Sequence, residues 1–121
     1  MQGQDSPVRA VLHAAGALDD IMFAEMTRKH LDTVLSTKVT GTLNLYKAVG
    51  HLDVFAMFSS ISAMLGTPAQ ANYSAANTFM DSFASYSRAN GGTGVSVQWG
   101  PWAEVGMAAR SGTAETSIQR L

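Results

Sequence analysis

The sequence predicts an α/β protein built on a parallel sheet. Three short apolar runs, at residues 8–15, 54–58 and 94–98, have the length and apolar character of buried strands. The segments between them, residues 28–49 and 70–89, carry apolar side chains at helical spacing. The order strand, helix, strand, helix, strand requires parallel strands with right-handed crossovers, which is the doubly wound, Rossmann-like arrangement.

The first half of the chain begins with the strand at residues 8–15, which ends where Gly16 interrupts the apolar run. Residues 19–20 are both acidic and indicate a loop. The apolar side chains at residues 22–26 have the spacing of a short amphipathic helix. The longer helix spans residues 28–49, and the glycine that follows it is a plausible stop.

The second half begins with the strand at residues 54–58, which leads into a pair of serines. Residues 66–68, Gly-Thr-Pro, are a turn signal before the helix at residues 70–89, which ends at an Asn-Gly-Gly sequence. The last strand cannot continue through Pro101, which has no N–H for the ladder. The polar segment after Ala109 is either a loop or the start of another helix.

The composition excludes several kinds of site and partner. The chain has no cysteine, so thiol catalysis, cysteine-based zinc sites and disulfides are excluded. Its three histidines are too far apart for a local metal motif, and no metal is predicted. The net charge of −1 and the scattered basic residues argue against a nucleic-acid partner. No apolar run reaches the ~18 residues of a membrane helix and no signal peptide is evident, so no membrane partner is expected. The absence of cysteine fits the cytoplasm, which is the expected location.

The residues best suited to chemistry fall at the expected carboxyl edge of the sheet. Tyr73 and Asn77 are four residues apart, which places them on one helix face, and Ser60 ends a strand. A phenol, an amide and a hydroxyl can together protonate a carbonyl oxygen while hydride arrives from elsewhere. The alternatives are a core tyrosine with a wet hydroxyl and a serine that caps a strand end. Ser59 and Ser62 compete with Ser60, and strand alternation does not decide between them.

Six segments resemble the ketoreductase domains of modular and iterative polyketide synthases, which are short-chain dehydrogenases/reductases. They follow the family's order and lie near its spacings: His13-Ala-Ala-Gly16, Leu18-Asp19-Asp20, Lys38-Val-Thr-Gly-Thr42, Phe58-Ser-Ser60, Tyr73-Ser-Ala-Ala-Asn77 and Trp99-Gly-Pro-Trp102. The resemblance covers nearly the whole chain and implies the C-terminal βαβαβ part of the short-chain reductase fold. Ordinary members of that superfamily carry Tyr-x-x-x-Lys, whereas this chain has an asparagine in the lysine position. That exchange resembles polyketide and fatty-acid synthase ketoreductases and argues against sugar epimerases.

The resemblance implies a role for each catalytic candidate. Tyr73 is expected to protonate the β-keto oxygen as hydride attacks the carbon. Lys38, as a nearby cation, is expected to lower the pKa of the Tyr73 phenol. Ser60, selected among the serines by the family's spacing, is expected to hydrogen-bond the substrate carbonyl. Asn77 is expected to complete the polar network.

Cofactor and substrate contacts are implied in the same way. NADPH is the expected cofactor, and its expected contacts are Ala15, Gly16, Lys38, Tyr73, Gly100 and Pro101. The expected substrate contacts are Asp20, Gln70, Trp99 and Met107.

The resemblance also implies the stereochemistry of the product. Leu18-Asp19-Asp20 resembles the fingerprint of B-type ketoreductases, which set a 3R hydroxyl. The tryptophan that marks A-type members eight residues before the tyrosine is absent, and Leu65 stands there. Gln70 rather than histidine lies three residues before the tyrosine, and Ala75 rather than proline lies two after it.

Residues 1–121 are expected to form only part of a ketoreductase domain. No Gly-x-Gly-x-x-Gly phosphate loop occurs, so the family's first three strands are expected before Met1 and its final strand after Leu121. The implied partners are an acyl carrier protein, with the β-ketoacyl substrate on its phosphopantetheine arm, and other synthase domains. Alone, the segment is expected to be poorly soluble or oligomeric and not to bind NADPH.

Two other interpretations stay open from the sequence. The chain could be a truncated, non-catalytic half-domain that packs against a partner, or a stand-alone short-chain reductase of a small ketone. Asn77 disfavours the second of these. A hydrophobic content of 46 % with only 14 % charged residues fits buried parallel strands and also fits a large interface.

Overall fold

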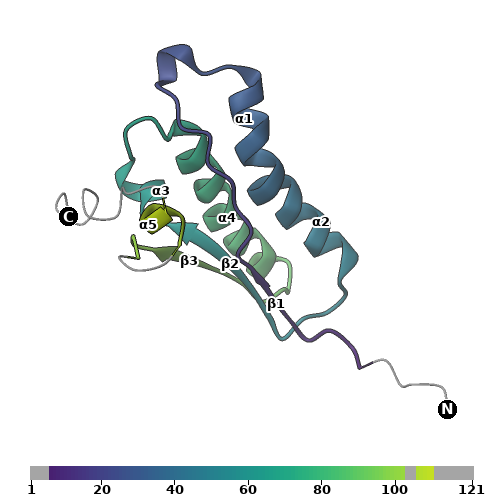
Figure 1. Ribbon diagram of the computed structural model, residues 1–121. Coiled ribbons are helices and arrows are strands. Elements are labelled where there is room, and N and C mark those ends of the chain that lie inside the picture. The colour runs from purple at the N-terminus through teal and green to yellow at the C-terminus, as the bar shows by residue number, and fades with distance from the viewer. Residues whose placement is uncertain (1–5, 103–105, 111–121) are drawn as a thin grey trace.

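The computed structural model describes residues 6–102 and 106–110, and its centre is a three-stranded parallel sheet (Figure 1). The strands are β1 (Ala10–His13), β2 (Val54–Ser60) and β3 (Gly94–Trp99), and β2 lies between the other two. The register places Met57 of β2 opposite both His13 and Ser96. The predicted α/β class and the parallel strand order are confirmed.

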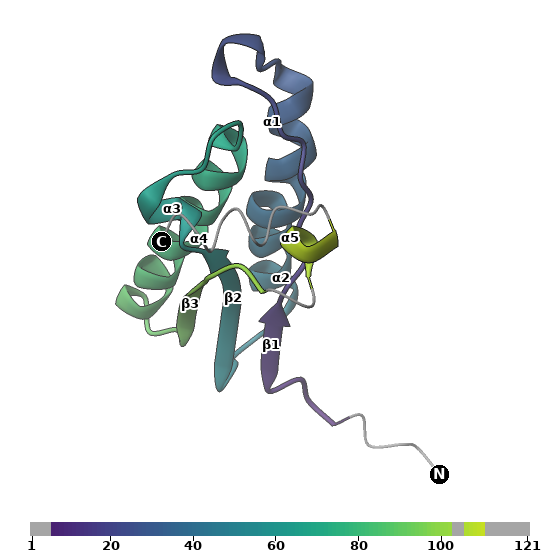
Figure 2. The same cartoon turned by 60° about the vertical axis from the view of Figure 1, so that its left-hand side comes forward.

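Helices α1, α2 and α4 cover one face of this sheet, and α3 and α5 lie near the carboxyl ends of the strands (Figure 2). Between β1 and β2 the chain forms η1 (Phe23–Glu25), α1 (Arg28–Leu35), the π-helical segment η2 (Ser36–Thr40) and α2 (Gly41–Ala48). Between β2 and β3 it forms α3 (Ser62–Leu65) and α4 (Ala71–Ala89), and α5 (Met107–Arg110) follows β3. The predicted long helix therefore exists, but its middle is a π-helical turn.

Several details differ from the expectations. β1 is shorter than residues 8–15, because only four residues pair with β2. The amphipathic helix expected at residues 22–26 is wrong: η1 is a short 3₁₀ turn without a buried residue, and Phe23 is 78 % exposed. Helix α3 was not expected, and the turn expected at residues 66–68 directly follows it. The polar tail from residue 111 onward lies outside the described residues.

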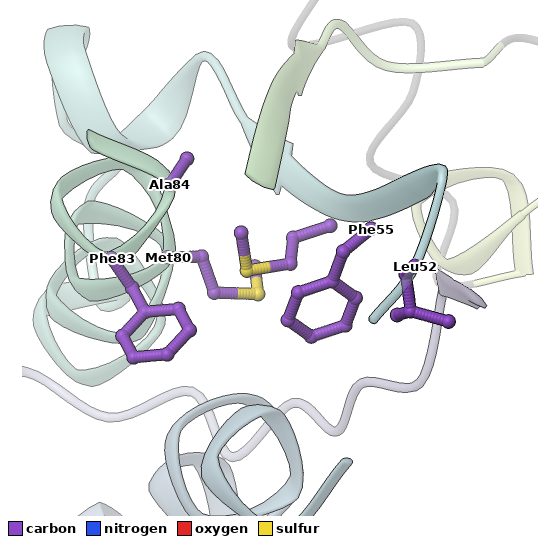
Figure 3. Packing of buried hydrophobic residues seen from close by; sticks show 6 residues of the cluster. Leu52, Phe55, Met80, Phe83 and Ala84 are labelled. Atoms are coloured by element: carbon purple, nitrogen blue, oxygen red, sulfur yellow. The ribbon is translucent and has the colours of Figure 1, made fainter. Parts of the chain in front are cut away.

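The hydrophobic core lies between β2 and α4 (Figure 3). Phe55 and Met57 of β2 pack against Met80 and Phe83 of α4. Tyr46 of α2 closes this core from a second helix, and its ring meets the ring of Phe83 edge-on with the centroids 5.1 Å apart. Such aromatic pairs add about 0.5–1.5 kcal/mol beyond the area that they bury. The core thus fixes α4 against the sheet and fixes the position of its first turn.

The face of the sheet opposite the helices is apolar and exposed. Residues in register on parallel strands share a face, so Leu12, Ala56 and Val95 form one row. Leu12 and Val95 are 67 % and 45 % exposed, and Val54 is 41 % exposed. This is the open apolar surface that a partial sheet is expected to have.

Candidate active site

A cleft of about 800 Å³ lies at the carboxyl end of the sheet. Its size falls within the range of about 300–1,000 Å³ that is typical of cofactor and small-molecule pockets. It brings together ten of the expected site residues: Gly16, Asp20, Lys38, Ser60, Gln70, Tyr73, Trp99, Gly100, Pro101 and Met107. Ala14 lines the cleft where Ala15 was expected, and Asn77 is fully buried without lining it.

Tyr73 lies in the first turn of α4 and lines the cleft. Burial raises the pKa of its phenol, and the charge of Asp20 adds to this shift. Hydrogen bonding from Asn77 and Ser60 favours the phenolate but does not compensate for burial. The phenol is therefore protonated at neutral pH, which is the form that can donate a proton. Desolvation of the phenol dominates, so the pKa of Tyr73 is raised overall, and the lowered pKa that was expected beside Lys38 is not the net result.

Lys38 lies in η2 and is only 3 % exposed. Its Nζ donates a 2.8 Å hydrogen bond to the carbonyl oxygen of Phe58 and lies 5.3 Å from the ring centroid of Tyr73. Burial lowers the pKa of Lys38 to about 8, although the charge of Asp81 opposes the shift. Lys38 therefore faces the Tyr73 ring as a cation. It sits in a π-helical turn, an irregularity that is frequent at functional sites.

Among the three candidate serines, Ser60 is the one whose hydroxyl lies beside the Tyr73 phenol. Its Oγ also accepts a 3.1 Å hydrogen bond from the N–H of Ser62. Ser59 is buried, and its hydroxyl donates to the carbonyl oxygen of Asn77 at 3.3 Å. These contacts favour Ser60 over Ser59 as the group that faces a bound carbonyl.

Asn77 supports the helical turn that carries the phenol. It is completely buried, and its Nδ2 donates a 2.9 Å hydrogen bond to the carbonyl oxygen of Tyr73. Its Oδ1 has no hydrogen-bond partner among the described residues. The amide thus lies next to the Tyr73 phenol and lowers its pKa, against the effect of burial.

The expected substrate contacts form two different walls of the cleft. On one wall, Gln70 Nε2 donates to both carboxylate oxygens of Asp20, at 3.1 and 3.0 Å. On the other, the rings of Trp99 and Trp102 meet nearly edge-on, with their centroids 5.4 Å apart. Met107 of α5 lines the same cleft. A bound molecule would therefore meet a polar wall and an apolar wall.

The cleft fits the nicotinamide end of a dinucleotide. A Cβ at Gly16 would lie 3.2 Å from Cε of Lys38 and 3.4 Å from Cε of Met107, so only glycine leaves that space open. A Cβ at Gly100 would meet nothing within 4 Å. The chain has no glycine-rich loop for the phosphates, so the fit extends to the nicotinamide end alone.

Replacing Gly16 with valine in the full-length protein is expected to weaken NADPH binding and reduction by at least about 10-fold, because the added side chain crowds Lys38. NADPH titration followed by initial rates checks this. Gly50→Val is the matched control, since a Cβ at Gly50 would meet nothing within 4 Å. Equal NADPH affinities in the two variants would contradict a cofactor contact at Gly16.

Two residues that line the cleft were given no site role from the sequence. Arg110 of α5 is a second basic residue in the lining, after Lys38, but it belongs to a segment that the sequence marks only as a polar tail. Leu18 also lines the cleft, although the resemblance directs attention to the aspartates beside it.

In the part of the chain that the structure describes, no three His, Cys, Asp or Glu side chains gather as a metal site. Nor does any helix there have the length and apolarity needed to cross a membrane.

The KR domain model matches residues 1–104 of this chain. The phenolphthiocerol synthesis polyketide synthase type I Pks15/1 of Mycobacterium marinum is 47 % identical over 108 residues, which are 88 % of this chain and 5 % of that protein. The 6-methylsalicylic acid synthase of Aspergillus terreus is 44 % identical over 105 residues, 85 % of this chain and 6 % of that protein. A solved A1-type ketoreductase superposes with a TM-score of 0.90 at 37 % identity, covering 97 % of this chain and 25 % of that one.

A parallel sheet with a cleft at its carboxyl end defines the class as a Rossmann-like α/β protein with the short-chain dehydrogenase/reductase fold. Within this class the chain belongs to the KR family, the ketoreductase domains of polyketide synthases. It spans about a quarter of the solved ketoreductase and about one twentieth of the matched synthases.

Proposed function

We propose that this chain supplies the catalytic part of an NADPH-dependent reductase that converts a β-ketoacyl thioester to a 3-hydroxyacyl thioester. The observation that carries the proposal is the phenol of Tyr73. It is kept protonated by burial, lines the cleft and has the Lys38 cation 5.3 Å from its ring. Ten residues that were expected at such a site line this one cleft, and this supports the proposal.

The chemistry divides between the cofactor and the chain. NADPH, when bound, supplies the hydride that adds to the carbonyl carbon. Ser60 donates a hydrogen bond to the carbonyl oxygen, where negative charge develops. Tyr73 gives its proton to that oxygen and becomes a phenolate. Lys38 stabilises the phenolate as the nearby cation, and Asn77 and Ser60 favour the same form by hydrogen bonding.

Membership of the KR family supports a proposal for the substrate and partners. The proposed substrate is carried on the phosphopantetheine arm of an acyl carrier protein, next to other polyketide synthase domains in the cytoplasm. The polar wall made by Asp20 and Gln70 suits the amides and thioester of such an arm, and the apolar wall made by Trp99 and Trp102 suits the acyl chain.

The same polar wall supports a 3R product. Gln70, three residues before Tyr73 along the chain, donates two hydrogen bonds that hold Asp20 at the cleft. The likeness to an A1-type structure concerns the overall backbone and does not fix the stereochemistry. Chiral chromatography of the hydroxyacyl product from the full-length protein is expected to give mainly the 3R alcohol. A 3S product would contradict the B-type assignment and leave the reduction itself in place.

We further propose that residues 1–121 are the catalytic half of a domain whose nucleotide-phosphate half comes from the rest of a longer protein. The test uses the full-length protein with two substrates, a carrier-bound β-ketoacyl thioester and a small free ketone. Faster reduction of the carrier-bound thioester is expected. Preference for the free ketone would favour a stand-alone short-chain reductase, and no reduction of either would favour a non-catalytic structural module.

A further inference from the structure

Asn72, the residue before Tyr73, connects three parts of the chain that border the cleft. It is 0 % exposed. Its Nδ2 donates to the carbonyl oxygen of Asp19 at 2.9 Å and to the carbonyl oxygen of His30 at 3.0 Å. Its Oδ1 accepts a 2.8 Å hydrogen bond from the backbone N–H of Tyr73. One amide therefore holds the loop that carries Asp20, the first turn of α1 and the first turn of α4.

The geometry requires an amide of this length. Both hydrogens on Nδ2 are used, and each reaches a backbone carbonyl more than forty residues away in sequence. The side-chain oxygen accepts a hydrogen bond from the N–H of Tyr73, which is one of the N–H groups that a helix start leaves without an intrahelical partner. Gln70, the N-cap residue of α4, makes no capping bond with its side chain. A carboxylate of the same shape could accept but could not donate.

Two further contacts tie the same loop to the start of α4. The backbone N–H of Ile21 donates to the carbonyl oxygen of Ala69 at 2.9 Å, and Gln70 binds the carboxylate of Asp20. Ala69 has a φ of 62°, a left-handed conformation that is uncommon for alanine. Hydrogen bonds thus connect the polar wall of the cleft to the helix that bears the phenol. Among the side chains that make them, Asn72 is the buried one.

We propose that Asn72 is a positioning residue that holds the loop of Asp20 and the phenol of Tyr73 in a fixed mutual position, so that one face of the substrate carbonyl is presented for reduction. This rests on the proposed ketoreductase function. Asn72 acts through its neighbours, since its side chain does not line the cleft. Loss of its two donors frees the loop to move relative to the phenol, and a displacement of about 1 Å at a reacting centre can lower the rate by ~100-fold.

The test replaces Asn72 with aspartate in the full-length protein, which keeps the shape and removes both donors. The rate of reduction is expected to fall by about 10-fold to 100-fold, with a rise in KM for the carrier-bound thioester and a lower ratio of 3R to 3S product. Asn90→Asp is the matched control. Asn90 ends the same helix, is exposed, and donates from Nδ2 to the carbonyl oxygen of Tyr86 at 2.8 Å.

The product ratio separates positioning from simple stability. If Asn72 were only structural, the variant would melt at a lower temperature but would give the wild-type product ratio and KM below its melting temperature, and this result would overturn the proposal. If Asn72→Asp does not fold, the neutral Asn72→Ser variant decides by the same readouts. If the wild-type protein does not reduce the thioester, the proposed function is wrong, and the inference that rests on it is wrong as well. Wild-type reduction that is lost in Tyr73→Phe and unchanged in Asn72→Asp refutes the positioning role alone.

Discussion

Replacing Tyr73 with phenylalanine in the full-length protein is expected to slow reduction of a carrier-bound β-ketoacyl thioester by about 100-fold to 10,000-fold, the usual contribution of a general acid. The change removes the proton donor and little else. The aromatic ring can stay where it lies, with Lys38 Nζ 5.3 Å from its centroid. Burial, which raises the pKa of the phenol, favours a ring without a hydroxyl. The loss should therefore appear in kcat, while NADPH binding stays near the wild-type value.

Tyr86→Phe is the matched control, because it makes the same chemical change on the same helix at a residue that is 56 % exposed. Initial rates with the carrier-bound substrate and an NADPH titration of each variant are the measurements. Wild-type turnover in Tyr73→Phe would refute the proton-donor role and with it the proposed reaction. Loss of NADPH binding in that variant would show instead that the Tyr73 hydroxyl is needed for the cofactor.

The parts of the fold that were predictable depend on local pattern. β2 buries alternate residues against α4, and its apolar run is visible in the sequence. α4 is a single long helix with a broad apolar face, and it begins within one residue of the predicted start. Because parallel strands bring their carboxyl ends to one edge, Ser60 and Tyr73 were expected near one another, and they are.

The parts that were not predictable depend on contacts between distant residues. The π-helical turn η2 is set by how the long helix packs, and a helical periodicity does not distinguish i→i+4 from i→i+5 bonding. The desolvation that raises the pKa of Tyr73 comes from tertiary packing, so the net direction of that shift could not be predicted from a cation in the sequence. The bonds from Asn72 to Asp19 and His30 span 53 and 42 positions and have no local signature.

Lys38→Met is expected to lower the rate of reduction by about 100-fold to 1,000-fold, the scale of removing one preorganised electrostatic group. The lysine Nζ lies 5.3 Å from the centroid of the Tyr73 ring, so its loss removes that positive charge from beside the phenolate formed during proton transfer. Methionine fills a similar volume and is suited to a site that is 3 % exposed. Lys47→Met, on the exposed side of α2, is the control and should keep wild-type rates.

The pH dependence makes this prediction sharper, because activity and stability should change in opposite directions. Burial lowers the pKa of Lys38 to about 8 from 10.5, so the unfolded chain holds this proton more tightly than the folded protein. Its contribution to the free energy of unfolding should therefore rise by roughly 3 kcal/mol between about pH 8 and 10.5. Over the same range the cation is lost, and the rate of reduction should fall.

Rates and denaturant unfolding measured from pH 6 to 10.5 separate the two effects. Lys38→Arg, whose guanidinium stays charged throughout, should shift the fall in rate to higher pH if it retains activity. Lys38→Met should lack both the fall in residual rate near pH 8 and the rise in stability above it. A wild-type rate that stays flat through pH 8 would show that no group titrating there controls the rate, and a Lys38→Met variant that keeps the same fall would show that a different group titrates. The charge on Lys38 would then have no part in the proton transfer.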